Sequence, residues 1–156
     1  MSDLYDMIDR LVLMEKDVQA NTDAVPVAFY AQEATPYWTT QINSFTVQED
    51  SLDLQIITYS ISMSLWLATT TEGFEQEAER KAQTILPAIL LYFAQRRQLK
   101  RTSADSAVTG LYPQGAVVTG GKVNYGDSNS GIGQGMFGVT VDIDVPMYIQ
   151  TSQVVF

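Results

Sequence analysis

The sequence contains no histidine and no cysteine, which leaves carboxylates as its main candidates for chemistry. Without histidine the chain lacks the commonest general base and the commonest transition-metal ligand, so hydrolases built on Ser–His or Cys–His pairs are excluded. Without cysteine, disulfides and thiolate metal sites are excluded as well. The remaining pair of interest is Asp142 and Asp144, whose strand-like spacing puts their Cα atoms about 7 Å apart on one face.

Two carboxylates at this spacing can do acid–base work or hold a divalent cation between them. Nothing nearby in the sequence supplies a substrate site, however, and two carboxylates alone make a weak cation site. The glycine-rich segment 126–135, GDSNSGIGQG, does not match a phosphate-binding loop, because it lacks the lysine and the following Ser/Thr and joins two strands. We therefore predict that the protein is not an enzyme and has no catalytic residue, no metal site and no cofactor.

Two long alternating segments, 54–68 and 137–149, must position these carboxylates. In the first, large apolar residues take the odd positions from Ile57 to Leu67, with small hydroxyls between them, and the second has the same parity. This period of two puts the large side chains on one face of a sheet. If the two strands share a sheet and alternate in step, its other face carries no cation from either strand. The residues expected there are Thr58, Ser60, Ser62, Ser64, Thr140, Asp142 and Asp144.

A polar, uncharged to mildly negative face of this kind has two interpretations. The simpler one is a sheet face wetted by solvent, but such faces usually carry lysine and glutamate, which also protect edges against aggregation. The other is the wall of a water-filled channel. A wall of this type repels phosphates, so DNA can pass along it without adhering.

Two amphipathic helices are expected to bury the apolar face of the sheet. The first covers residues 3–20, and its stripe is apolar except at Glu15. The second begins after Gly73 and runs to about Gln98, with Pro87 inside it, where a proline should kink or split a helix. The expected strands cover residues 25–32, 37–47, 54–68, 115–125 and 137–149, with a polar turn at 48–51.

These elements predict a single α+β domain over residues 1–156, with a mainly antiparallel β-sheet and two long helices packed on one of its faces. The chain is long enough to bury one sizeable core. Frequent glycine makes segment 126–135 a flexible loop between the last two strands.

The charge of the chain argues against nucleic-acid binding, and its lack of a long apolar run argues against membrane insertion. With 18 acidic and 9 basic residues the net charge is −9, whereas phosphate binding depends on clustered lysine and arginine. No apolar run approaches the length of a membrane span, and the acidic N-terminus lacks the order of a signal peptide. We expect a soluble protein made in the cytoplasm.

Four of the basic residues are gathered in one cluster, which is either a solvated helix end or a contact for an acidic partner. These residues are Arg96, Arg97, Lys100 and Arg101.

In the order and length of its elements, the chain resembles the tail terminator and tail-completion proteins of long-tailed bacteriophages, and more broadly the head–tail neck and tail-tube fold. The resemblance covers roughly Asp3–Ile149. It rests on the acidic N-terminal helix, two strands, the alternating strand ITYSISMSLWLA, the helix containing PAILLYFAQRR, and two C-terminal strands. It implies an α+β subunit that forms a ring, commonly a hexamer, which caps the tail tube and joins it to the head connector.

The resemblance also implies partners and a place for each candidate site. The partners would be other copies of the chain, the tail-tube protein and a head-completion or connector protein, with DNA only passing through and no membrane involved. The protein would reside in the virion tail or neck after assembly in the host cytoplasm. Positions expected to face the channel are Ser60, Ser62, Ser64, Thr140, Asp142 and Asp144. The resemblance makes the glycine-rich loop, with Asp127, Ser128, Asn129 and Ser130, a contact for a partner or another subunit. Separately, from its charge, we predict the same role for the basic cluster of Arg96, Arg97, Lys100 and Arg101.

Two alternatives remain open at this point. The ring subunit could serve as a neck adaptor or a tail-tube subunit instead of a terminator. From a different class, the chain could be a soluble ligand-binding module whose sheet–helix cleft is walled by aromatic side chains. Those side chains would be Trp38, Tyr59, Trp66 and Phe93.

Overall fold

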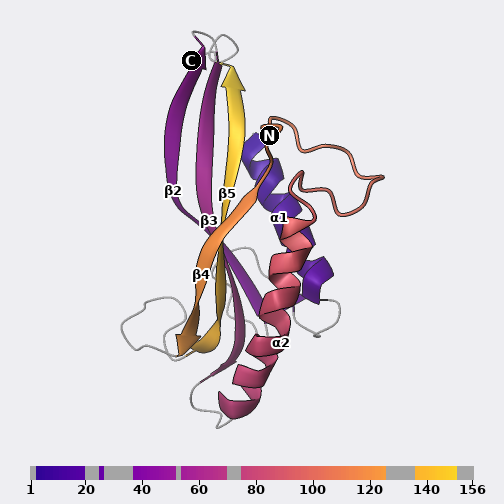
Figure 1. Cartoon of the computed structure of the whole chain (residues 1–156), viewed down its shortest axis with the longest axis vertical. Coiled ribbons are helices and arrows are strands. Elements are labelled where there is room, and N and C mark those ends of the chain that lie inside the picture. Colours follow the sequence, from indigo (N-terminus) through magenta and orange to yellow (C-terminus); the bar gives the residue numbers. More distant parts are fainter. Residues whose placement is uncertain are drawn as a thin grey trace.

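The fold is an antiparallel sheet combined with two helices, seen here in a computed structural model that describes residues 3–19, 25–26, 37–51, 54–69, 75–125 and 136–150 (Figure 1). The strand order is β1-β2-β3-β5-β4, in which the two-residue β1 pairs parallel with β2 and all other pairs are antiparallel. The α+β class predicted from the sequence is confirmed. The elements are α1 (Asp3–Gln19), β1 (Val25–Pro26), β2 (Tyr37–Ser51), β3 (Leu54–Thr69), α2 (Glu75–Ala94), β4 (Val117–Tyr125) and β5 (Met136–Gln150).

The two long alternating strands are neighbours at the centre of the sheet, and their alternation is in step. Ser60 lies opposite Asp144, and Ser62 lies opposite Asp142. Because side chains directly opposite each other in a sheet point to the same face, the hydroxyl positions of β3 and the carboxylate positions of β5 share one face. The sequence predicted this face only on condition that the strands paired in this register.

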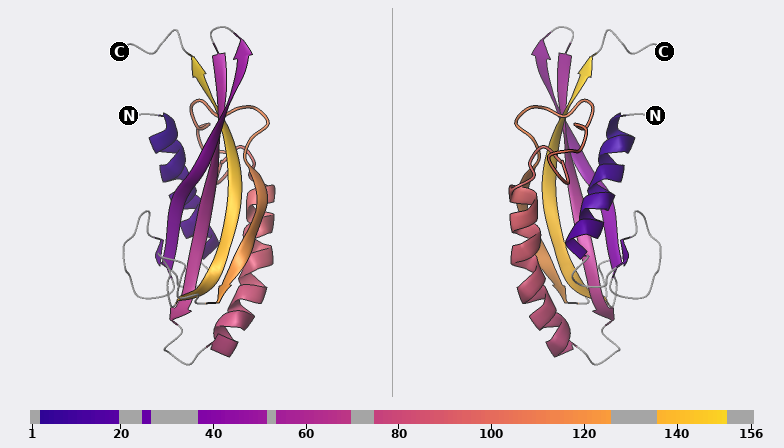
Figure 2. Two further views of the ribbon diagram at one scale, coloured as in Figure 1. Left: turned by 90° about the vertical axis from the view of Figure 1, so that its left-hand side faces the viewer. Right: turned by 90° about the vertical axis from the view of Figure 1, so that its right-hand side faces the viewer.

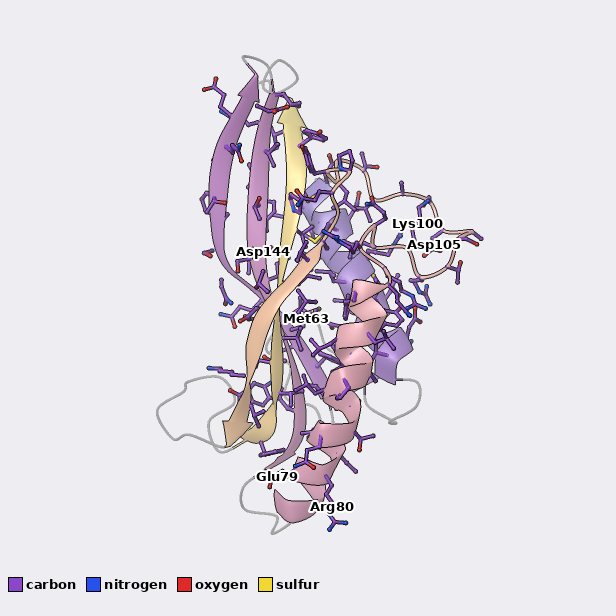
Figure 3. All side chains as sticks on the ribbon, in the orientation of Figure 1. Met63, Glu79, Arg80, Lys100, Asp105 and Asp144 are labelled. Atoms are coloured by element: carbon purple, nitrogen blue, oxygen red, sulfur yellow. The ribbon has the colours of Figure 1, made fainter. Side chains whose placement is uncertain are left out.

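The opposite face of these strands is the main part of the hydrophobic core. Met63 and Ile143 are fully or almost fully buried there, and Figure 3 shows Met63 between the sheet and α2. Both helices add side chains at intervals of three and four residues, the spacing of one helical face. From α1 these are Met7, Leu11, Met14 and Val18, and from α2 they are Ala82, Ile85, Ile89 and Phe93.

One acid lies inside this core. Glu15 of α1 is completely buried, and its Oε1 accepts a hydrogen bond of 2.5 Å from Oγ1 of Thr40 in β2. Its Oε2 has no hydrogen-bond partner among the described residues. Burial raises the pKa of this carboxyl to about 8 from its usual 4.5, and the hydrogen bond from Thr40 opposes this only in part. Glu15 is therefore mainly protonated in the folded chain at neutral pH.

The second helix differs from the prediction at two points. It runs without interruption through Pro87, so of the two predicted alternatives, a kink or a split, the split is wrong. The buried side chains on its inner face compensate for the one backbone hydrogen bond that proline removes. It also ends at Ala94 rather than near Gln98. Beyond it the chain reverses, and Leu99 adopts a left-handed conformation with φ of 54° while its side chain is fully buried. Burial of the Leu99 side chain stabilises this chain reversal relative to continuation of the α2 helix.

Other boundaries also differ from the predictions. The polar turn expected at 48–51 is wrong, because β2 continues to Ser51 and pairs there with Leu54. The hairpin of β2 and β3 is therefore longer than expected, and together with the end of β5 it projects beyond both helices (Figures 1 and 2). Most of the strand expected at 25–32, and the glycine-rich loop 126–135 with Asp127, Ser128, Asn129 and Ser130, lie outside the described residues.

Candidate functional site

Polar side chains from four strands line a groove of about 410 Å³ on the hydroxyl face of the sheet. The groove belongs to the face that carries the predicted serine, threonine and aspartate positions, and β2 and β4 extend it on either side. Its lining residues are Thr39, Gln41, Asn43, Ser62, Ser64, Trp66, Lys122, Asn124, Thr140 and Asp142.

The side chains in the groove are hydrogen-bonded to one another across the strands. Asn43 Nδ2 donates to Ser62 Oγ, which donates to Asp142 Oδ1 at 2.6 Å, so one chain of hydrogen bonds links β2, β3 and β5. A second link joins Asn124 Nδ2 to Thr140 Oγ1 at 2.8 Å, and that hydroxyl lies 2.8 Å from Ser64 Oγ. Groups already paired in this way offer little hydrogen-bonding capacity to a passing molecule.

The tryptophan at the edge of the groove belongs to the same polar layer. Trp66 Nε1 donates to Thr39 Oγ1 at 3.0 Å, which directs the indole to the groove rather than to the core. Trp38 and Phe93, in contrast, are fully or almost fully buried in the core on the other side of the sheet. The prediction of one cleft walled by these aromatic side chains is therefore wrong, because Trp66 lies on the groove face of the sheet and Trp38 and Phe93 lie on its core face.

The groove contains one cation that sequence reasoning missed. Lys122 of β4 lies opposite Thr140 of β5 and is exposed at the groove. The prediction considered only β3 and β5, the two strands with clear alternation, and neither of them contributes a cation. The expected absence of positive charge therefore holds for these two strands but not for the whole face. The polar residues at 122 and 124 were the available signal for β4. They could not be assigned to a face before its pairing with β5 was known.

All six predicted channel positions lie on this one face of the sheet, at different depths. Ser64 and Thr140 are buried at the base of the groove, whereas Ser62 and Asp142 are half-buried in its wall. Ser60 and Asp144 face each other one step further along β3 and β5, outside the groove lining. Among the described residues, no group of three or more carboxylates is arranged to hold a metal ion.

The predicted basic cluster divides into two pairs with different surroundings. Arg101 donates two hydrogen bonds to the carboxylate of Asp17 in α1, from Nε to Oδ2 at 2.6 Å and from Nη2 to Oδ1 at 2.9 Å. This contact lowers the pKa of Asp17. Arg96 lies over the Tyr92 ring, 4.0 Å from its centroid. These two arginines therefore have structural roles within the chain.

The other two cations of the cluster remain available for contacts. Neither Arg97 nor Lys100 forms an ion pair with a described carboxylate, and both line a shallow hollow of about 520 Å³ between Ala94 and Ser103. The hollow follows directly from the early end of α2, because the chain turns there instead of continuing as a helix. Figure 3 labels Lys100 in the segment that follows α2.

Comparison of the chain with protein-family models gives no match, and comparison with curated proteins gives none. No described helix combines the length and the apolar character needed to cross a membrane. The geometry of the groove and of the basic hollow therefore carries the functional argument alone.

Proposed function

We propose that this chain is a structural protein of a bacteriophage tail, a tail terminator whose copies form a ring of six around a channel for DNA. The groove face of the sheet would line the channel, and the ring would cap the tail tube and join it to the head connector. The protein would then reside in the virion after assembly in the host cytoplasm.

The observation that carries this proposal is the hydrogen-bonded polar face spanning β2, β3, β5 and β4. Asn43, Ser62, Ser64, Asn124 and Thr140 are hydrogen-bonded within it. The charged residues in and beside its groove are Asp142, Asp144 and Lys122. A nucleic-acid binding surface needs clustered cations, because neutralised phosphates supply most of its affinity. This face has the opposite character, which suits a wall along which a polyanion slides.

In the proposed ring both helices would lie on the face of the sheet that points away from the channel. The shared core of α1, α2, β3 and β5 supports this arrangement, as do the two ribbon views in Figure 2. With the helices outside, the polar face is left uncovered and can curve around an axis with its counterparts from other copies.

Electron microscopy of purified tail tubes with and without the protein tests the proposal. A terminator stops tube growth and adds ring density at one end of each tube. A tail-tube subunit polymerises into long tubes without a partner, and a neck adaptor binds the connector instead of the tube. A protein that binds no tube and is missing from virions would overturn the whole proposal.

The channel wall itself can be tested with added cations. Gln41 and Asn43 both line the groove and are exposed, so the pair Gln41→Lys and Asn43→Lys should leave the ring intact but slow DNA release, because each lysine attracts phosphates. DNA release is measured by dye fluorescence after virions are triggered. The matched control is Ala107→Lys with Thr109→Lys, two exposed positions between α2 and β4 that do not line the groove, which should release DNA at the normal rate. Equal rates in both variants would contradict a channel role for this face.

A further inference from the structure

The projecting hairpin of β2 and β3 carries an exposed apolar strip. Phe45 is 63% exposed and Val47 is 52% exposed, although they lie opposite Tyr59 and Ile57, on the side of the sheet that forms the core elsewhere. The end of the hairpin extends past both helices (Figure 2), and the large exposed fractions of Phe45 and Val47 show that neither helix covers these two side chains. Large apolar side chains grouped on an exposed surface mark an interaction site more often than a solvated one.

The strip continues into an acidic tip. Glu49 follows Phe45 and Val47 at the same spacing of two, so the three side chains share a face over about 14 Å. Asp50 follows Glu49 in the chain and adds a second acid at the end of the hairpin. Segment 37–69, which forms the whole hairpin, contains no lysine or arginine. The hairpin therefore presents an apolar stem with a purely acidic end.

The outer face of α2 has the complementary character. Leu91 is 58% exposed and Leu90 is 39% exposed, and Pro87 and Ala94 are exposed beside them. From Pro87 to Ala94 the helix rises about 10 Å. Immediately after this apolar stretch comes the basic hollow lined by Arg97 and Lys100. Apolar and charged portions thus follow one another in the same order, and over a similar length, as on the hairpin.

We propose that the hairpin of one copy docks on the outer face of α2 in a neighbouring copy, with Phe45 and Val47 against Leu91 and the acidic tip in the basic hollow. The occupant is a second copy of this chain, because every copy carries both surfaces and the two are complementary in charge. The contact joins two different patches, so successive contacts close into a ring when the rotation between copies permits it. The docking mode deepens the proposed function, since it rests on ring formation by this chain.

Disulfide cross-linking tests this contact directly, because the chain contains no cysteine of its own. Val47→Cys protein is mixed with Leu91→Cys protein at high concentration and oxidised. We expect a covalent dimer that contains one copy of each variant, and a ladder of larger species from a chain that carries both substitutions. The control replaces Leu91→Cys with Leu13→Cys, a comparably exposed leucine on α1, which should give little dimer. Absence of the mixed dimer, or equal yields with Leu91→Cys and Leu13→Cys, overturns the docking mode.

Charge reversal provides a second test of the tip. Glu49→Lys with Asp50→Lys should abolish the cross-link between Val47→Cys and Leu91→Cys, and Arg97→Glu with Lys100→Glu in the Leu91→Cys partner should restore it. Failure of the second change to restore the cross-link would refute the pairing of tip and hollow. Tubes that are capped by rings without this cross-link would overturn the docking mode and leave the proposed function standing. A cross-linked ring that caps no tube would support the docking mode and overturn the proposed terminator function.

Discussion

The buried acid Glu15 predicts an unusual dependence of stability on pH. Its pKa is about 8 in the folded chain, against 4.5 for an ordinary glutamate. Between these values the unfolded chain has lost a proton that the folded chain retains, so the free energy of unfolding falls as pH rises. The slope is about 1.4 kcal/mol per pH unit, and the whole window removes roughly 4–5 kcal/mol. Below pH 4.5 both states are protonated and this contribution vanishes, whereas above about pH 8 the full loss persists.

Glu15→Gln removes this dependence while preserving the shape of the side chain. The amide oxygen still accepts from Thr40, and the amide nitrogen replaces a protonated oxygen that has no partner among the described residues. We expect the variant to match the natural protein near pH 4.5 and to be more stable by about 3 kcal/mol at pH 7. That difference is a large part of the 5–15 kcal/mol typical of a whole domain.

Urea unfolding at pH values from 4.5 to 8 measures this effect, with tryptophan fluorescence as the signal, because Trp38 and Trp66 are both buried. The matched control is Asp9→Asn, an exposed acid on the same helix, which should keep the pH slope of the natural protein. A Glu15→Gln variant with that same slope would refute the assignment of a buried, protonated carboxyl to α1.

Two further predictions concern close packing and one ion pair. A Cβ atom on Gly121 would collide with the carbonyl oxygen of Thr140, whereas one on Gly120 would meet nothing. Gly121→Ala should therefore lower the free energy of unfolding by about 2 kcal/mol or more, and Gly120→Ala by less than about 0.5 kcal/mol. Urea unfolding of the two variants measures both values. Asp17→Asn should cost about 1 kcal/mol at pH 7, because its contact with Arg101 is partly exposed and screened. This difference should vanish as pH falls through the lowered pKa of Asp17 in the folded chain, since the natural protein then loses the same ion pair, and equal costs at pH 2 and pH 7 would contradict it.

The sequence predicted those parts of the fold in which one pattern persists over many residues. The unbroken alternation of β3 and β5 identified the polar face and its six candidate positions, because a period of two leaves no other assignment within a strand. Lys122 was missed because β4 is short and has two glycines, Gly120 and Gly121, at its centre, which interrupt the alternation. The face on which Lys122 lies therefore depends on the pairing of β4 with β5.

Contacts between distant residues account for the other differences. The basic cluster looked uniform, and only the fold shows that Arg101 is paired with Asp17, 84 residues away. Leu99 carries no local signal for a left-handed turn, since glycine or asparagine normally takes that conformation. Its burial against the core decides where α2 ends, and that information is spread over several elements rather than contained in the helix.

The position of β5 has a consequence for how the chain folds. The strand nearest the C-terminus lies between β3 and β4, so residues about 80 apart, such as Ser62 and Asp142, must meet before the centre of the sheet exists. Such distant pairing slows folding, because a long loop must close before its contacts form. On the ribosome, the β2–β3 hairpin emerges well before its central neighbour. Until β5 inserts, β3 is an edge strand with an apolar face, so the newly made chain passes through a stage in which it is most exposed to aggregation.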